Sequence, residues 1–204
     1  PAALAIQGDV ALEGNELDSA FNIFSEIATR YPLSGEREIA LERISRIHGS
    51  QDRIPEMVES YLLLIDSFPD TPSRAEACFW VGVGYYELEQ FGEALPFLHE
   101  AAQLDPDLYS NRAGIRIILC HHHLEQRDHL LHACRVYLQR NTDAGVLNEM
   151  QKLDRPDPIP RWLLIDLGHG LLTGKNFIDA EFFLSRAVDP AEPESVPSLV
   201  WRDL

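Results

Sequence analysis

The chain has 204 residues, of which 45% are apolar and 25% charged, enough for one ordinary globular domain or two small ones. Its 17 basic and 33 acidic residues give a formal net charge of −16, which disfavours contact with a phosphate backbone and argues against a nucleic-acid-binding protein. No apolar run approaches the ~20 residues of a membrane-spanning helix, and three cysteines are too few for a disulfide framework.

Columns of similar residues recur along the first half of the chain at a step of 37. The clearest column is proline, at Pro32, Pro69 and Pro106. A second column holds large apolar residues: Phe24, Tyr61 and Leu98. Within each unit, apolar residues stand three to four positions apart in two stretches, which predicts two amphipathic helices that end near the proline. We therefore expect helix pairs at about 1–34, 38–71 and 75–108.

Weaker signals follow in chain order. A fourth pair is predicted at 111–142, with its register left open because His121 and Leu130 replace an expected aromatic residue and alanine. A run of prolines and charges then interrupts the pattern, which predicts an insertion or linker at 143–160. A fifth pair is expected at 161–188, and 189–204 is interpreted as a C-terminal tail or a cap on the last pair.

The third unit resembles the tetratricopeptide repeat family in a set of small, aromatic and aliphatic positions: Cys78, Val81, Gly82, Tyr85, Phe91, Ala94, Leu98, Ala101 and Pro106. The resemblance implies an all-α fold, a right-handed α-solenoid of about five helix pairs. It also implies a non-catalytic scaffold, without a cofactor, that binds a protein or peptide. A third reading is a structural segment of a longer repeat protein.

A finer resemblance is carried by an aromatic and proline signature in the first unit: Phe24, Ile27, Tyr31, Pro32 and Ser34. It is similar to repeats of bacterial envelope lipoproteins that assist outer-membrane assembly or coordinate the Tol–Pal system. The signature also occurs in cytoplasmic repeat proteins, and the chain shows no basic-then-apolar leader. Periplasm, envelope and cytoplasm are therefore all left open as locations.

Sequence signatures of the common enzyme classes are missing from the chain. It holds no Gly-x-Ser-x-Gly, no Gly-x-x-x-x-Gly-Lys and no His-Glu-x-x-His, so we predict no catalytic residues. Gly82 and Gly84 imitate part of a dinucleotide-binding motif, but they fall inside a predicted helix, where close packing explains them.

Five of the eight histidines gather near two cysteines. Zinc prefers thiolate and imidazole ligands, and the weak candidates here are Cys120, His123, His129, His132 and Cys134. Successive helical residues point about 100° apart, so neighbouring histidines cannot all face one ion. We therefore predict no metal, and a metal-binding or pH-responsive module stays the alternative function.

In the tetratricopeptide repeat family the first helix of each pair lines the concave face, where ligands bind. Transferred to this sequence, the resemblance predicts partner-binding residues from the second pair to the last: Arg46, Phe79, Val83, Tyr86, Ile115, Leu119, His122, Trp162 and His169. Members that clamp a terminal carboxylate use lysine and asparagine on this face. Ala5, Asp9 and Glu42 stand there instead, which disfavours that ligand class.

Overall fold

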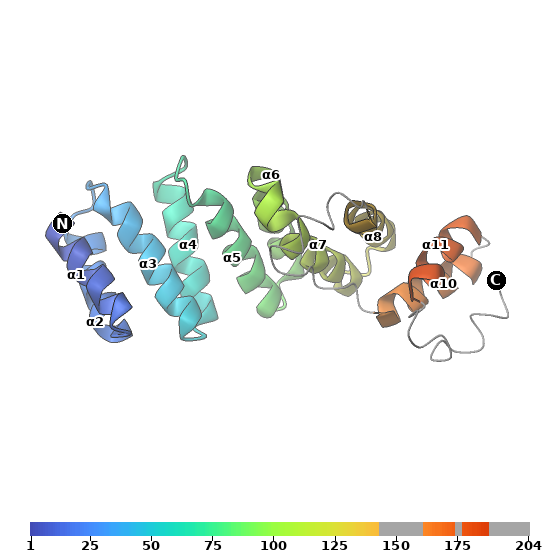
Figure 1. Ribbon diagram of the computed structural model, residues 1–204, viewed down its shortest axis with the longest axis horizontal. Helices are drawn as coiled ribbons and strands as arrows, with labels where there is room; N and C mark the ends of the chain where they lie inside the picture. Colours follow the sequence, from blue (N-terminus) through green and yellow to red (C-terminus); the bar gives the residue numbers. More distant parts are fainter. Residues whose placement is uncertain (143–160, 174–176, 188–204) are drawn as a thin grey trace. The chain divides into compact units, whose positions relative to one another are not determined.

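Every regular element in the described part of the chain is a helix. The computed structural model describes residues 1–142, 161–173 and 177–187. The helices are α1 (Ala2–Glu13), α2 (Leu17–Arg30), α3 (Glu36–Ser50), α4 (Ile54–Ser67), α5 (Arg74–Glu87), α6 (Phe91–Leu104), α7 (Pro106–His123), α8 (Arg127–Thr142), α10 (Arg161–Thr173) and α11 (Phe177–Ala187) (Figure 1). The predicted all-α class is confirmed. The predicted segments at 143–160 and 189–204 lie outside the described residues.

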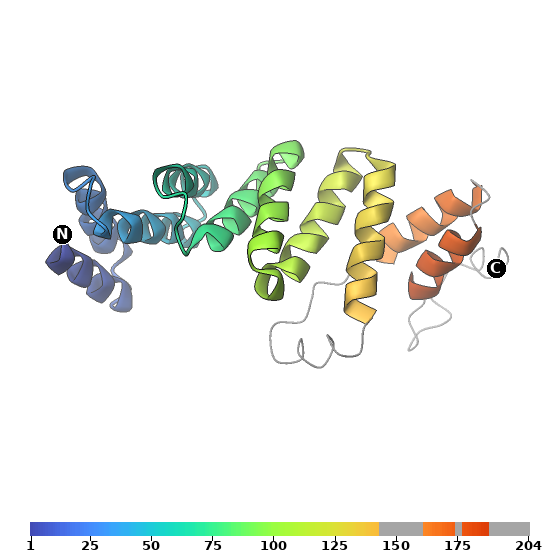
Figure 2. The ribbon, with the colours of Figure 1, turned by 90° about the horizontal axis from the view of Figure 1, so that it is seen from above.

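The chain divides into two units, Pro1–Tyr137 and Leu138–Leu204. In unit 1, consecutive helices pack against each other from α1 through to α7, and short turns make neighbours antiparallel (Figures 1 and 2). In unit 2, α10 packs against α11. This is the arrangement of a helical-pair solenoid, as the repeat pattern predicts.

The turn inside each of the first four pairs is marked by one residue with a left-handed backbone. These residues are Asn15, Asp52, Glu89 and Glu125, with φ between 55° and 59°. Asparagine and aspartate tolerate this conformation better than glutamate does. The step between them is 37 residues twice and then 36, from Glu89 to Glu125. The span from the third turn to the fourth, which holds α6 and α7, is therefore one residue shorter than the others, and this settles the register that the sequence left open.

The junction between α6 and α7 is tighter than the sequence predicts. Pro106 is the first residue of α7, where its missing N–H costs nothing, and the Asp105 side chain caps the helix by accepting from the backbone N–H of Leu108 at 3.1 Å. The fourth pair thus begins before the predicted position 111. Pro96 lies inside a continuous α6, and the carbonyl left without its N–H belongs to the exposed Gly92.

Within a pair, a small residue on the first helix faces a large one on the second. A Cβ added at Gly82 would lie 2.7 Å from Leu98 Cγ, and one at Gly168 would lie 2.4 Å from Leu184 Cγ. In the fourth pair the sizes are exchanged, because the matching positions hold Ile118 on α7 and Cys134 on α8, both fully buried. The exchange keeps the summed side-chain volume close to that of the other pairs.

Candidate functional site

The helices α1, α3, α5 and α7 are the first helices of the pairs in unit 1, and their shared surface is called here the first-helix face. Consecutive first helices touch, since α1 contacts α3 and α5 contacts α7. Side chains of this face can therefore bond from one pair to the next. Two regions of different chemistry result, a polar network on α1, α3 and α5 and an aromatic cluster on α5 and α7.

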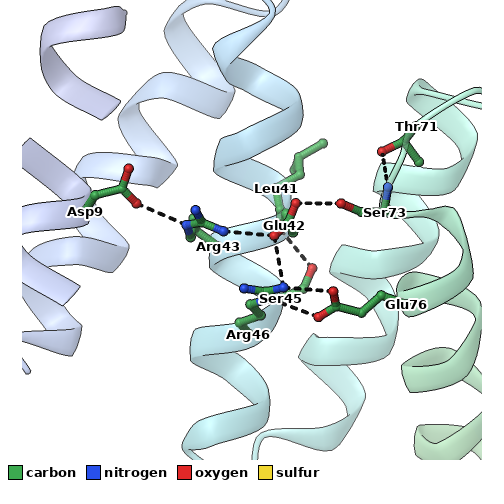
Figure 3. A network of polar contacts seen from close by, with 9 residues as sticks. All are labelled: Asp9, Leu41, Glu42, Arg43, Ser45, Arg46, Thr71, Ser73 and Glu76. Carbon is green, nitrogen blue, oxygen red and sulfur yellow. Dashed lines mark hydrogen bonds and ion pairs between the residues drawn. The ribbon is translucent and has the colours of Figure 1, made fainter. Parts of the chain in front are cut away.

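The polar network begins between α1 and α3 (Figure 3). Arg43 donates through Nε to Asp9 Oδ1 at 3.0 Å and through Nη1 to Glu42 Oε1 at 2.8 Å. The other oxygen of Glu42 accepts from the Ser73 hydroxyl at 2.7 Å. Glu42 is thus bonded on both oxygens, and the network ties the first pair to the second and third.

Arg46 extends this network to α5. Its Nε and Nη2 donate to the two carboxylate oxygens of Glu76 at 3.0 and 2.8 Å, a bidentate pair. The hydrogen bond to Glu76 is the main reason that the pKa of Arg46 lies above its ordinary value. Arg46 also lies 3.3 Å from Glu42 Oε1. The charges of both arginines are therefore offset by three carboxylates within the network.

The aromatic cluster is centred on Phe79 of α5. Its ring stacks on Tyr109 with centroids 4.9 Å apart, and it meets Trp80 edge-on at 5.3 Å. The guanidinium carbons of Arg112 and Arg116, both on α7, lie 5.8 and 5.7 Å from the same ring centre. Phe79 itself is only 3% exposed, whereas Trp80 exposes 37% of its surface. Trp80 therefore presents the accessible aromatic surface of this cluster.

The predicted partner-binding residues of unit 1 lie on α3, α5 and α7, with unequal access. Arg46 is exposed, and Tyr86, Leu119 and His122 are half-buried. The other three are buried and belong to the core: Phe79, Val83 and Ile115. In unit 2, Trp162 is exposed and His169 is half-buried, both on α10.

Sequence reasoning missed Trp80, Arg112 and Arg116. Trp80 and Arg116 occupy the repeat column of Arg43, which is one residue after the predicted column of Phe79. Consecutive residues on a helix are rotated by about 100° from each other, so the column of Phe79 and the column of Trp80 differ strongly in exposure. An available signal was the spacing of Arg112 and Arg116, four residues apart on one predicted helix.

The cysteines of the weak metal candidate lie in the core. Burial raises the pKa of the Cys120 and Cys134 thiols to about 12. Cys78 is buried with its thiol pKa raised in the same way. None of the three is disulfide-bonded.

The histidines near these thiols make other contacts. His123 stacks on Phe91 with ring centroids 4.2 Å apart, and His121 stacks on His129 at 5.3 Å. His132 is exposed. In the described ranges, no three side chains of histidine, cysteine, aspartate or glutamate are grouped so that they could hold a metal ion.

The sequence profile of the tetratricopeptide repeat family matches residues 75–108, which contain α5 and α6. The chain carries a tetratricopeptide repeat. Such repeats are typically non-catalytic scaffolds for protein–protein interaction. No curated protein sequence matches the chain significantly. Over the described residues, no helix has the length and apolar character needed to cross a membrane.

Solved structures of other repeat proteins share the fold. YrrB, described as a tetratricopeptide-repeat protein with an unusual peptide-binding site, has a TM-score of 0.64 at 16% identity, covering 98% of this chain and 91% of its own. MamA from Desulfovibrio magneticus RS-1 has a TM-score of 0.60 at 15% identity, covering 95% and 94%. BtubC from P. vanneervenii has a TM-score of 0.55 at 14% identity, covering 90% and 76%. At these identities the likeness concerns the fold alone.

Proposed function

We propose that this protein is a non-catalytic scaffold whose first-helix face binds a peptide segment of a partner protein. The observation that carries the proposal is Trp80, which exposes 37% of its surface beside the buried ring of Phe79. Large aromatic residues at a surface are frequent anchors of protein interfaces, because they bury much area with little loss of side-chain entropy. Ile39 on α3, in the repeat column of Glu76 and Arg112, is also 42% exposed.

The surroundings of Trp80 support the role of an anchor. Phe79 cannot move freely, since it lies against Tyr109 and beneath two arginines. The neighbouring polar network holds α3 and α5 at a defined spacing through the pair of Arg46 and Glu76. A preformed surface of this kind loses less entropy on binding than a mobile one. The peptide-binding site described for YrrB, which shares the fold, makes a peptide the favoured ligand.

Replacing Trp80 by alanine tests this proposal. Peptides are first selected on the immobilised protein from a phage library of random sequences, and their affinities are measured by fluorescence anisotropy. We expect Trp80→Ala to weaken binding by about 2 kcal/mol or more, as loss of a central aromatic anchor does. The matched control is Leu63→Ala, which removes a 45% exposed side chain from the second helix α4.

Loss of affinity in the Leu63→Ala variant but not in Trp80→Ala would move the site to the second-helix face. Circular dichroism of each variant checks that helix content is unchanged. Trp162→Ala, on α10, tests in the same assay whether the predicted residues of unit 2 contribute.

A partner in the bacterial envelope is the finer form of the proposal. It rests on the signature of Phe24, Tyr31 and Pro32 in the first pair, and the similarities reported above do not address it. Affinity capture from separated envelope and cytosolic fractions of bacteria tests it. Trp80-dependent capture of partners from the cytosolic fraction alone would contradict it.

A further inference from the structure

Two arginines lie over the ring of Phe79, which Trp80 meets edge-on, in a chain whose net charge is −16. Arg112 and Arg116 stand one turn apart on α7, and both guanidinium groups lie within 6 Å of the centre of the Phe79 ring. Like charges at this spacing repel each other. A guanidinium that stacks on an aromatic ring keeps its in-plane N–H groups available for hydrogen bonds. The arrangement therefore directs donors along the rim of the ring.

Two carboxylates of the first-helix face, Glu42 and Glu76, are already engaged. Glu76 accepts from Arg46 with both oxygens, and Glu42 accepts from Arg43 and Ser73. Among the described residues, Arg116 makes one hydrogen bond, from Nη1 to the backbone oxygen of Arg112 at 3.1 Å, and no ion pair. Its side chain is half-buried, so its charge is only partly solvated. An external carboxylate would complete its bonding.

We propose that the peptide bound on the first-helix face is acidic, with aspartate or glutamate side chains on Arg112 and Arg116 and an adjacent apolar residue on Trp80. This inference rests on the proposed function and adds the class of ligand to it. The acidic groups are internal side chains, because Asp9 and Glu42 occupy the positions where a clamp for a terminal carboxylate needs basic or amide residues. At physiological salt, charges more than ~8 Å away are screened, so distant acidic residues of the chain weaken the attraction of an acidic peptide to the two arginines only slightly.

The experiment uses the selected peptides, which in the phage library have no free C-terminus. They are synthesised with amidated C-termini, and each is paired with a version in which glutamine or asparagine replaces the acidic residues. We expect the selected sequences to contain acidic residues beside an apolar one. Neutralising those residues, or the change Arg116→Gln, should weaken binding about tenfold, the loss of one charge-assisted hydrogen bond.

Controls separate charge from packing. Arg30→Gln removes the same charge from α2, where Arg30 pairs with Glu26, and it should leave affinity unchanged. Arg116→Lys keeps the charge and should retain most of the affinity lost in Arg116→Gln. The double change Arg112→Glu with Arg116→Glu should make the protein prefer peptides with lysine at the acidic positions.

The outcomes distinguish this inference from the proposed function. Selected peptides that need Trp80 but show no acidic residues, or that bind Arg116→Gln as well as the wild type, would overturn the inference and leave the proposed function standing. Peptides that bind independently of Trp80, or a selection that yields none, would contradict the proposed function itself.

Discussion

At the scale of single residues, close contact between the two helices of the third pair depends on glycine. A Cβ at Gly82 would lie 2.7 Å from Leu98 Cγ and 3.1 Å from the Leu98 backbone nitrogen, both shorter than normal contacts. Leu98 is fully buried, so its side chain cannot turn away into solvent. A Cβ at Gly92, near the start of α6, would meet no atom within 4 Å. Packing therefore requires glycine at position 82 and leaves room for a larger residue at position 92.

We expect Gly82→Ala to destabilise the protein by about 1–3 kcal/mol, as overpacking of a core does. Gly92→Ala should be neutral or stabilising by up to about 1 kcal/mol, because alanine favours a helix and meets no neighbour there. Urea unfolding followed by circular dichroism measures both changes. Equal destabilisation by the two substitutions would show that contact with Leu98 is not the cause.

At the scale of elements, the C-terminal end of α7 holds a titratable group in the core. His121 is 7% exposed, its Nδ1 lies 2.8 Å from Gln126 Oε1, and its ring stacks on His129. Burial lowers the pKa of His121, which Gln126 partly offsets and His129 lowers further. Burial also lowers the pKa of His99 on α6, and the charge of His121 adds to that effect. The fold therefore favours the neutral imidazole at this end of α7.

Acidification should loosen the end of α7. A histidine with a lowered pKa contributes stability that is complete above its ordinary pKa of about 6.5 and is lost as the pH falls through the lowered value. Hydrogen exchange of 117–124, corrected for its intrinsic pH dependence, should therefore be faster at about pH 5 than at about pH 7.5. The change should shrink in His121→Gln and persist in the control His132→Gln, whose histidine is exposed. An equal change in all three proteins would assign the effect to other groups.

At the scale of the whole molecule, stability in unit 1 is distributed along a row of neighbouring contacts. Phe24 belongs to a cluster of α1, α2 and α3, whereas Leu98 belongs to a separate cluster of α5, α6 and α7. Phe24 and Leu98 occupy the same repeat column but stabilise different groups of helices. Stability in such a row is a sum of local terms, and loss at one place spreads mainly to adjacent pairs.

Replacing either Phe24 or Leu98 by alanine should change hydrogen exchange in a different group of helices. Phe24→Ala costs about 3–5 kcal/mol locally and should accelerate exchange in α1, α2 and α3 while amides of α6 stay protected. Leu98→Ala should accelerate exchange in α5, α6 and α7 and spare α1 and α2. Uniform acceleration by either substitution would show that unit 1 unfolds as one cooperative block.

The sequence by itself determined the fold class and the helix pairs. Helix formation depends on apolar residues three to four positions apart, and pairing depends on small and large residues in fixed columns, such as Gly82 and Leu98. Both are local patterns that recur at a step of 37, so they can be found without coordinates. The shorter third step, of 36 residues, became visible only from the turn residues Glu89 and Glu125.

Only the tertiary structure decided which side chains of the first helices are accessible and which are bonded. The resemblance pointed to Phe79, but contacts with Tyr109 and the α7 arginines bury it and leave the next residue, Trp80, exposed. The bond of Arg46 to Glu76 joins residues 30 positions apart. Burial and ion pairing on this face depend on the distance and rotation between neighbouring helices, and these follow from packing across the pairs, which no local pattern specifies.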